Sequence, residues 1–157
     1  MIAAGIVLTP TGKSEELKNE EPFPLLVTVT TETDTEKHSD SDDCKISMYF
    51  NDLKENKVFL DNPGQDDFRI GALDSFSGIK VPLPLEKIEK VTLQVEAGAD
   101  AWRLKRISLQ FFQGNRKTDV ITFPGKISLS KDRKDRACKE KVVFVFSESK
   151  KGKMTLR

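Results

Sequence analysis

The sequence predicts an all-β domain, an antiparallel β-sandwich of about eight short strands. Segments rich in β-branched and aromatic residues recur along the chain, and Gly, Pro, Asn or Asp separate them about every ten residues. No segment has the apolar periodicity of a long amphipathic helix. The 157 residues are enough for one domain with its own core. We expect a lead-in or linker over 1–22, the sandwich over 23–147 and a flexible tail over 148–157.

The N-terminal half contains the first four expected strands. Residues 25–31 are apolar and β-branched, and apolar side chains alternate with polar ones over 46–50. A third strand, over 58–60, ends at an Asp-Asn-Pro-Gly turn, and a linker over 68–76 contributes aromatic side chains. Apolar residues alternate with prolines over 81–85, which predicts an edge strand because proline lacks an N–H donor.

The C-terminal half continues the pattern. Alternation over 91–95, a break at 97–100 and a second apolar segment over 104–111 predict a hairpin with Trp102 at its mouth. Further short strands are expected over 120–123, 127–129 and 142–146. The residues expected to face the space between the sheets are Val27, Val29, Ile46, Met48, Phe50, Val91, Leu93, Val95, Leu104, Ile107, Leu109, Val143 and Val145.

Composition limits the function. There is one histidine, His38, and no nucleophile elbow, zinc-binding helix motif, phosphate loop or Cys-x-x-Cys, so we expect no enzyme activity from this chain itself. No nucleic-acid motif occurs, and no apolar run approaches the length of a membrane span. Cys44 and Cys138 are compatible with one disulfide or with two thiols.

Charge is distributed unevenly along the chain. Residues 1–100 contain 10 Lys and Arg against 20 Asp and Glu, whereas residues 101–157 contain 16 against 5. This predicts acidic loops in one place and basic strands in another, unless the strands of the sandwich interleave the two halves in space.

The acidic loop between the first two strands is the candidate metal site. Flexible Asp-rich loops supply the oxygen ligands that Ca²⁺ prefers, and Asp67 comes from a later loop at the same end. The expected ligands are Asp40, Asp42, Asp43 and Asp67. The alternative is a solvated acidic loop that binds nothing.

The hairpin with Trp102 is the candidate binding tip. An indole beside cations such as Arg103 and Lys105 suits contact with a lipid surface, another protein or a sugar. The alternative is a core tryptophan that closes one end of the sandwich.

Several segments resemble the PLAT (polycystin-1, lipoxygenase, alpha-toxin) family, also called the lipoxygenase-homology domain. The first strand (26–31) is similar to the family's opening strand, and 67–76 is similar to its Phe-x-x-Gly-x-x-Asp-x-Phe linker. Residues 101–107 resemble its Trp-x-Leu-x-x-Val element, and the ending over 121–146 is similar to the C-terminal domain of pancreatic-type lipases. The first loop lacks the family's Gly-Thr-Asp, and the aromatic residues after Phe123-Pro124 are missing.

The resemblance implies an eight-stranded antiparallel β-sandwich of PLAT type. It also implies a membrane- or protein-docking module, which calcium could assist and which localises a lipid-handling enzyme, a channel or another partner. Peripheral membrane association follows from this, whereas the compartment and the oligomeric state stay open. The alternatives are a purely protein-binding sandwich without a lipid or metal role and a carbohydrate-binding sandwich that uses Trp102.

Overall fold

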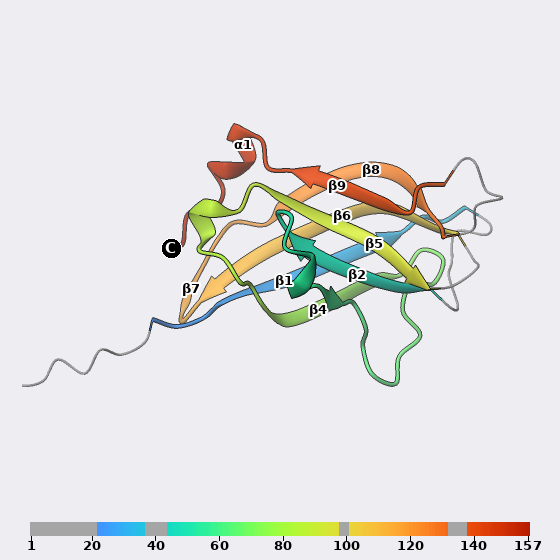
Figure 1. Ribbon diagram of the computed structural model, residues 1–157, viewed down its shortest axis with the longest axis horizontal. Coiled ribbons are helices and arrows are strands. Elements are labelled where there is room, and N and C mark those ends of the chain that lie inside the picture. Colours follow the sequence, from blue (N-terminus) through green and yellow to red (C-terminus); the bar gives the residue numbers. More distant parts are fainter. Residues whose placement is uncertain (1–21, 37–43, 98–100, 132–137) are drawn as a thin grey trace, which may run out of the picture.

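The computed structural model describes residues 22–36, 44–97, 101–131 and 138–157 and contains two packed antiparallel β-sheets (Figure 1). In the first sheet the order is β4-β1-β6-β7, and β8 also pairs with β6; in the second it is β3-β2-β5-β9. The first sheet consists of β1 (Leu25–Thr33), β4 (Leu73–Lys80), β6 (Trp102–Gln113), β7 (Arg116–Lys117) and β8 (Ile121–Leu129). The second consists of β2 (Lys45–Phe50), β3 (Val58–Phe59), β5 (Lys90–Ala97) and β9 (Lys141–Val145). The predicted all-β sandwich is confirmed.

Helical structure in the described residues is limited to three short segments. They are the 3₁₀ turns η1 (Lys54–Asn56) and η2 (Leu85–Lys87) and the α-helix α1 (Glu148–Lys151). None of these is long and apolar enough to cross a membrane.

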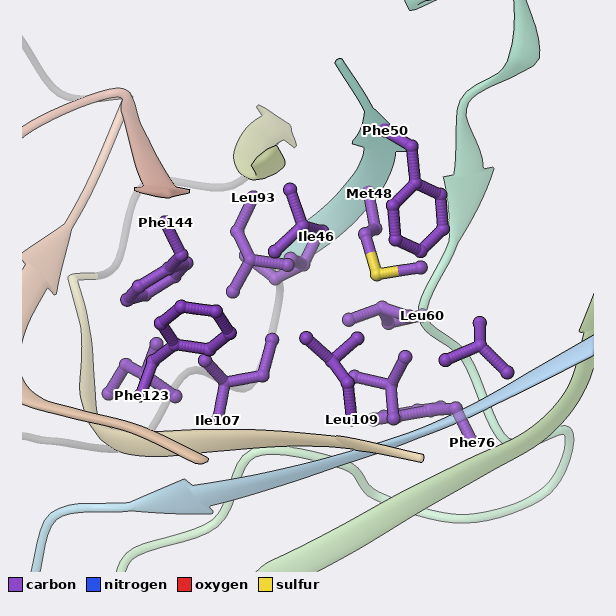
Figure 2. Packing of buried hydrophobic residues seen from close by; sticks show 14 of the residues in the cluster. Ile46, Met48, Phe50, Leu60, Phe76, Leu93, Ile107, Leu109, Phe123 and Phe144 are labelled. Carbon is purple, nitrogen blue, oxygen red and sulfur yellow. The ribbon is translucent and has the colours of Figure 1, made fainter. Parts of the chain in front are cut away.

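The core lies between the two sheets and is filled by alternating side chains of both (Figure 2). Ile46, Met48 and Leu93 from the second sheet face Ile107 and Leu109 from the first, and all five are fully buried. The expected core residues outside β9 are buried in the same way.

The prediction for β9 was wrong by one residue of register. Val143 and Val145 point outward and are 43% and 64% exposed, whereas Phe144 and Phe146 are buried. The phenylalanine rings pack on Phe123, with centroids 5.3 and 5.1 Å away. Since a phenyl ring buries more apolar area than a valine, the strand turns its aromatic face inward.

The edge strand of the first sheet also differs from the prediction. Residues 81–85 do not form a strand; β4, over 73–80, takes this place and pairs with β1. The N–H of Val81 still donates to the carbonyl of Leu25 (2.9 Å), and pairing ends there because Pro82 and Pro84 lack the N–H groups that a paired strand needs.

The C-terminal segment packs on the domain instead of forming the loose tail that was expected. Lys150 donates a hydrogen bond to the carbonyl of Thr122, and its Nζ lies 4.8 Å from the centroid of the Phe123 ring. Arg157 exchanges two backbone hydrogen bonds with Lys117 of β7 (3.0 and 3.1 Å). The end of the segment is therefore hydrogen-bonded to the edge strand β7.

Cys44 and Cys138 do not form a disulfide. They precede β2 and β9, and β5 lies between these two strands in the sheet. A bridge would need the two strands to be neighbours, so the order of the sheet explains why none forms.

The sandwich has two ends, a loop end and a hairpin end. At the loop end (right in Figure 1), β1 and β5 finish and β2, β4 and β6 begin; at the hairpin end (left), β6 turns into β7 and the C-terminal segment lies beside it.

Candidate functional site

Trp102 lies at the loop end but is fully buried. Its indole Nε1 donates a 3.0 Å hydrogen bond to Oγ1 of Thr33, and its ring centroid lies 4.6 Å from that of Phe68. The prediction that Trp102 lies exposed at a binding tip was therefore wrong. The structure has the alternative, a core tryptophan that closes one end of the sandwich. Its N–H is satisfied internally, so the indole has no need of solvent or a ligand.

The linker motif over 68–76 is explained by its contacts with this plug. Phe68 packs between Trp102 and Phe76 and adopts a φ of +65°, a conformation that is unfavourable for a residue with a side chain. Its N–H donates a 2.9 Å hydrogen bond to Oδ2 of Asp74, which helps to hold this conformation. Gly71 has a φ of +69°, and a Cβ there would meet the Thr35 side chain at 3.4 Å. The spacing of Phe, Gly, Asp and Phe therefore builds the support for the buried indole.

The position of Asp74 changes the pKa of its carboxyl group. Burial raises the pKa of its carboxyl group above the ordinary value of 3.8, and the hydrogen bond from Phe68 opposes the shift. The nearby carboxylates of Asp66 and Asp67 raise the pKa further. The local structure thus concentrates negative charge on one side of the loop end.

Asp67 is the only expected calcium ligand within the described residues, and its oxygens are already engaged. They accept hydrogen bonds from the backbone N–H of Asn62 (2.7 Å) and from its Nδ2 (2.8 Å). The carboxylate therefore fixes the turn between β3 and β4. Asp40, Asp42 and Asp43 lie outside the described residues.

A cavity of about 390 Å³ lies beside Asp67 at the loop end. Its lining combines the apolar Phe59 and Leu60 with the acidic Asp61 and Asp66. Asp66 pairs with Arg69 at 2.6 Å, and no group of three His, Cys, Asp or Glu side chains converges within the described parts of the chain. The described donors by themselves therefore do not fit a calcium ion.

Arg103 and Lys105 lie on the outer surface at the loop end, half exposed, and each is paired with a carboxylate. Arg103 contacts Glu36 at 2.5 Å, and Lys105 contacts Glu32 at 2.8 Å. Arg106 contacts the other oxygen of Glu32. Each of these cations thus has a carboxylate partner in or just after the end of β1.

A β-bulge brings two of these cations to the same carboxylate. Glu32 pairs with Arg106 and the next residue, Thr33, pairs with Leu104, so Lys105 has no partner in β1. The hydrogen bond from Lys105, together with the charge of Arg106, holds the pKa of Glu32 below its ordinary value of 4.5. Alternation alone could not place Lys105 and Arg106 on one face; the bulge does.

The hairpin end has the opposite arrangement on the same outer surface. Directly paired residues form a row across β4, β1, β6, β7 and the C-terminal segment, here called the cross-strand row. Its members in spatial order are Lys80, Leu26, Phe112, Lys117 and Arg157. The apolar centre is half buried, and the cations at both sides are exposed.

The cations of the cross-strand row have no acidic partners among the residues that the structure describes. Lys80, Lys117, Arg157 and the adjacent Arg116 take part in none of the ion pairs formed by described residues. Lys117 and Arg157 face each other directly, an arrangement that is unfavourable unless an anion lies nearby.

Phe23 extends this surface. It is 70% exposed and lies over Gly114, where a Cβ would come within 2.9 Å of the phenyl ring. Its carbonyl accepts a hydrogen bond from Nε2 of Gln113, which holds the segment before β1 against the hairpin. Sequence analysis missed this surface because its members are far apart in the chain; the excess of cations after residue 100 was the one available signal.

Solved structures with a similar fold include a lipoxygenase and an alpha-toxin. Coral 8R-lipoxygenase, described as activated by calcium through a C2-like domain, matches with a TM-score of 0.57 and 17% identity over 76% of this chain and 16% of the lipoxygenase chain. Alpha-toxin from Clostridium absonum matches with a TM-score of 0.53 and 18% identity over 73% of this chain and 31% of the toxin chain. The present chain thus spans less than a third of either protein.

No family model and no curated protein sequence matches the chain. The similarity therefore lies in the arrangement of strands, which lipoxygenase and alpha-toxin share with this chain at low sequence identity. The chain has the PLAT-type β-sandwich fold that the resemblance of its sequence motifs implies.

Proposed function

We propose that this chain is a non-catalytic docking module that binds an anionic membrane surface through its hairpin end. The cross-strand row is the observation that supports this proposal. Its cations, which form no ion pair with another described residue, attract phospholipid headgroups, and the apolar centre together with Phe23 suits the boundary between headgroups and acyl chains. The structurally similar domains belong to a lipoxygenase and an alpha-toxin, which is consistent with a module that localises a lipid-handling partner.

The energies available favour this end over the loop end. Each free cation near an anionic surface contributes about 1 kcal/mol. At the loop end, the ion pairs with Glu32 and Glu36 would have to be broken first. Binding there would therefore gain less from the same number of basic side chains.

Co-sedimentation with vesicles that contain phosphatidylserine tests the proposal. Replacing Lys117 and Arg157 with alanine should weaken binding about 30-fold, which corresponds to about 2 kcal/mol for two cations. The matched control removes the same charge at the loop end, through Arg103→Ala and Lys105→Ala, and should change binding much less. A larger loss in the loop-end variant would place the membrane site there and refute the proposal.

Calcium-assisted binding at the loop end is the second candidate. It is favoured by the coral lipoxygenase, whose C2-like domain is described as the route of calcium activation. Asp40, Asp42 and Asp43 would have to supply most of the ligands, since Asp67 already binds Asn62. Vesicle binding that requires calcium and is insensitive to Lys117→Ala would favour this candidate.

A further inference from the structure

The outer edge of β9 has backbone groups available for pairing. Within its own bounds β9 pairs in the described structure only with β5, whereas Lys139, two residues before it, is already paired on the outer side with the end of β8 (Leu129), so the open part of the edge begins at Lys141. The N–H of Val95 donates to the carbonyl of Glu140, and the N–H of Phe146 donates to that of Glu89, which fixes the even-numbered residues as those bonded to β5. The N–H and C=O groups of Val143 and Val145 therefore point away from β5.

The exposed side chains of this strand are apolar. Val143 and Val145 project from the outer face of the sheet, while Phe144 on the opposite face contacts Phe123 in the core (Figure 2). Two exposed β-branched residues beside unpaired backbone groups form a template for another strand.

The other sheet edges have features that hinder strand pairing. On β8, Pro124 lacks an N–H, and Lys150 occupies the carbonyl of Thr122. β3 has only two residues, and the register of β4 shifts opposite the segment between Val27 and Val29. Natural sheets commonly protect their edges in these ways. The middle of β9 has none of these features.

The charges around β9 indicate the kind of strand that fits. Lys139 and Lys141 lie at its start, and Lys150 follows its end; none of the three forms an ion pair with another described residue. Of the acidic residues nearby, Glu140 alternates onto the face of Phe144, and Glu148 pairs with Lys151 at 4.0 Å. A second copy of the chain, paired antiparallel with β9, would bring cations of one copy toward cations of the other. A strand with carboxylates at its ends would be attracted at both.

We propose that the free edge of β9 binds an extended apolar segment of a partner protein, flanked by acidic residues, by β-strand addition. Backbone hydrogen bonds to Val143 and Val145 would provide the pairing, and the lysines would select the acidic ends. This interaction goes beyond membrane docking and uses a different surface, so the chain could bind a membrane and a protein together.

A fluorescent nonapeptide, Glu-Glu-Thr-Val-Thr-Val-Thr-Glu-Glu, is the probe. Binding to the full chain is measured by polarisation, together with a peptide whose glutamates are replaced by lysines and one with proline at its centre. The test variant combines Val143→Glu and Val145→Glu, whose charges repel the glutamates of the peptide, and the matched control is Val120→Glu, at a valine that is 50% exposed outside β9. Melting temperatures verify that both variants fold.

The acidic peptide should bind the wild type and Val120→Glu equally and the β9 variant at least tenfold more weakly. The lysine and proline peptides should bind at least tenfold more weakly to the wild type, and amide shifts in NMR should cluster at 141–145. Absence of binding at millimolar peptide, or equal binding by the β9 variant, would overturn the proposal. Self-association that the β9 variant abolishes would overturn the choice of partner in favour of a second copy.

Discussion

The loop end and the hairpin end present basic side chains on the same outer surface of the first sheet, but in different electrostatic states. At the loop end Lys105 and Arg106 share Glu32, and Arg103 contacts Glu36. At the hairpin end Lys117 faces Arg157, and no described residue contributes a side-chain carboxylate paired to either. The comparison shows that the number of cations is a poor guide to a docking surface; their acidic neighbours decide whether they are available.

The buried indole at the loop end should have the largest effect on stability. Trp102→Ala should lower the free energy of unfolding by about 3–5 kcal/mol, because it leaves a cavity beside Phe68 and removes the partner of Thr33. Phe23→Ala at the hairpin end should cost less than about 1 kcal/mol, since this ring is mostly exposed. Urea unfolding measures both.

Fluorescence provides an independent check of the same contrast. The emission of Trp102 should be blue in buffer and should not shift when anionic vesicles are added, because the indole is already in an apolar environment. A shift of the emission maximum on vesicle addition would show that Trp102 takes part in membrane binding.

Asp67 should contribute to stability through its hydrogen bonds. Asp67→Asn should cost about 1.5–3 kcal/mol, because the two donors of Asn62 lose a charged acceptor. The loss should be the same in calcium and in EDTA. A loss that appears only with calcium present would identify Asp67 as a metal ligand.

Calcium should stabilise the loop end if the acidic loop binds it. At a free concentration ten times the Kd, the gain would be about 1.4 kcal/mol, seen as a higher melting temperature. Changing Asp42 and Asp43 to Asn should abolish the gain. An unchanged melting temperature of the wild type at millimolar calcium would exclude the metal site.

The smallest expected effect comes from Glu32. Its folded-state pKa lies below the ordinary 4.5, so its ion pairs stabilise the fold above that pH and the contribution is lost as the pH falls through the folded pKa. Glu32→Gln should therefore make stability less dependent on pH between about 6 and 3. At neutral pH it should also increase vesicle binding a few-fold, because Lys105 and Arg106 are released. Unchanged acid sensitivity would show that these ion pairs contribute nothing measurable.

The sandwich was predictable because alternation specifies a strand with one buried face. Ile46, Met48 and Leu93 were placed correctly for this reason. The buried face of β9 was not placed correctly, because the residues from Val142 to Phe146 are all apolar and alternation then cannot indicate which face is buried. The packing of Phe144 and Phe146 on Phe123 determines it.

The candidate site was less predictable than the fold. The row from Lys80 to Arg157 depends on cross-strand register, which sequence patterns do not specify. The pairing of Lys105 with Glu32 depends on a bulge and on a contact between residues 73 positions apart. Such contacts decide which charges are available, and local sequence contains little information about them.

The extra residue at Lys105 gives β6 two hydrophobic phases. Before it, the even-numbered Trp102 and Leu104 face the core; after it, the odd-numbered Ile107 and Leu109 do. Deleting this single residue would bring Trp102, Leu104, Ile107 and Leu109 into one continuous alternation, with the bulge gone and the buried set unchanged, but it would remove one of the two cations that share Glu32. The extra residue thus serves the charged surface and not the core, so sequence comparisons should allow a one-residue gap here without any change in the buried pattern of β6.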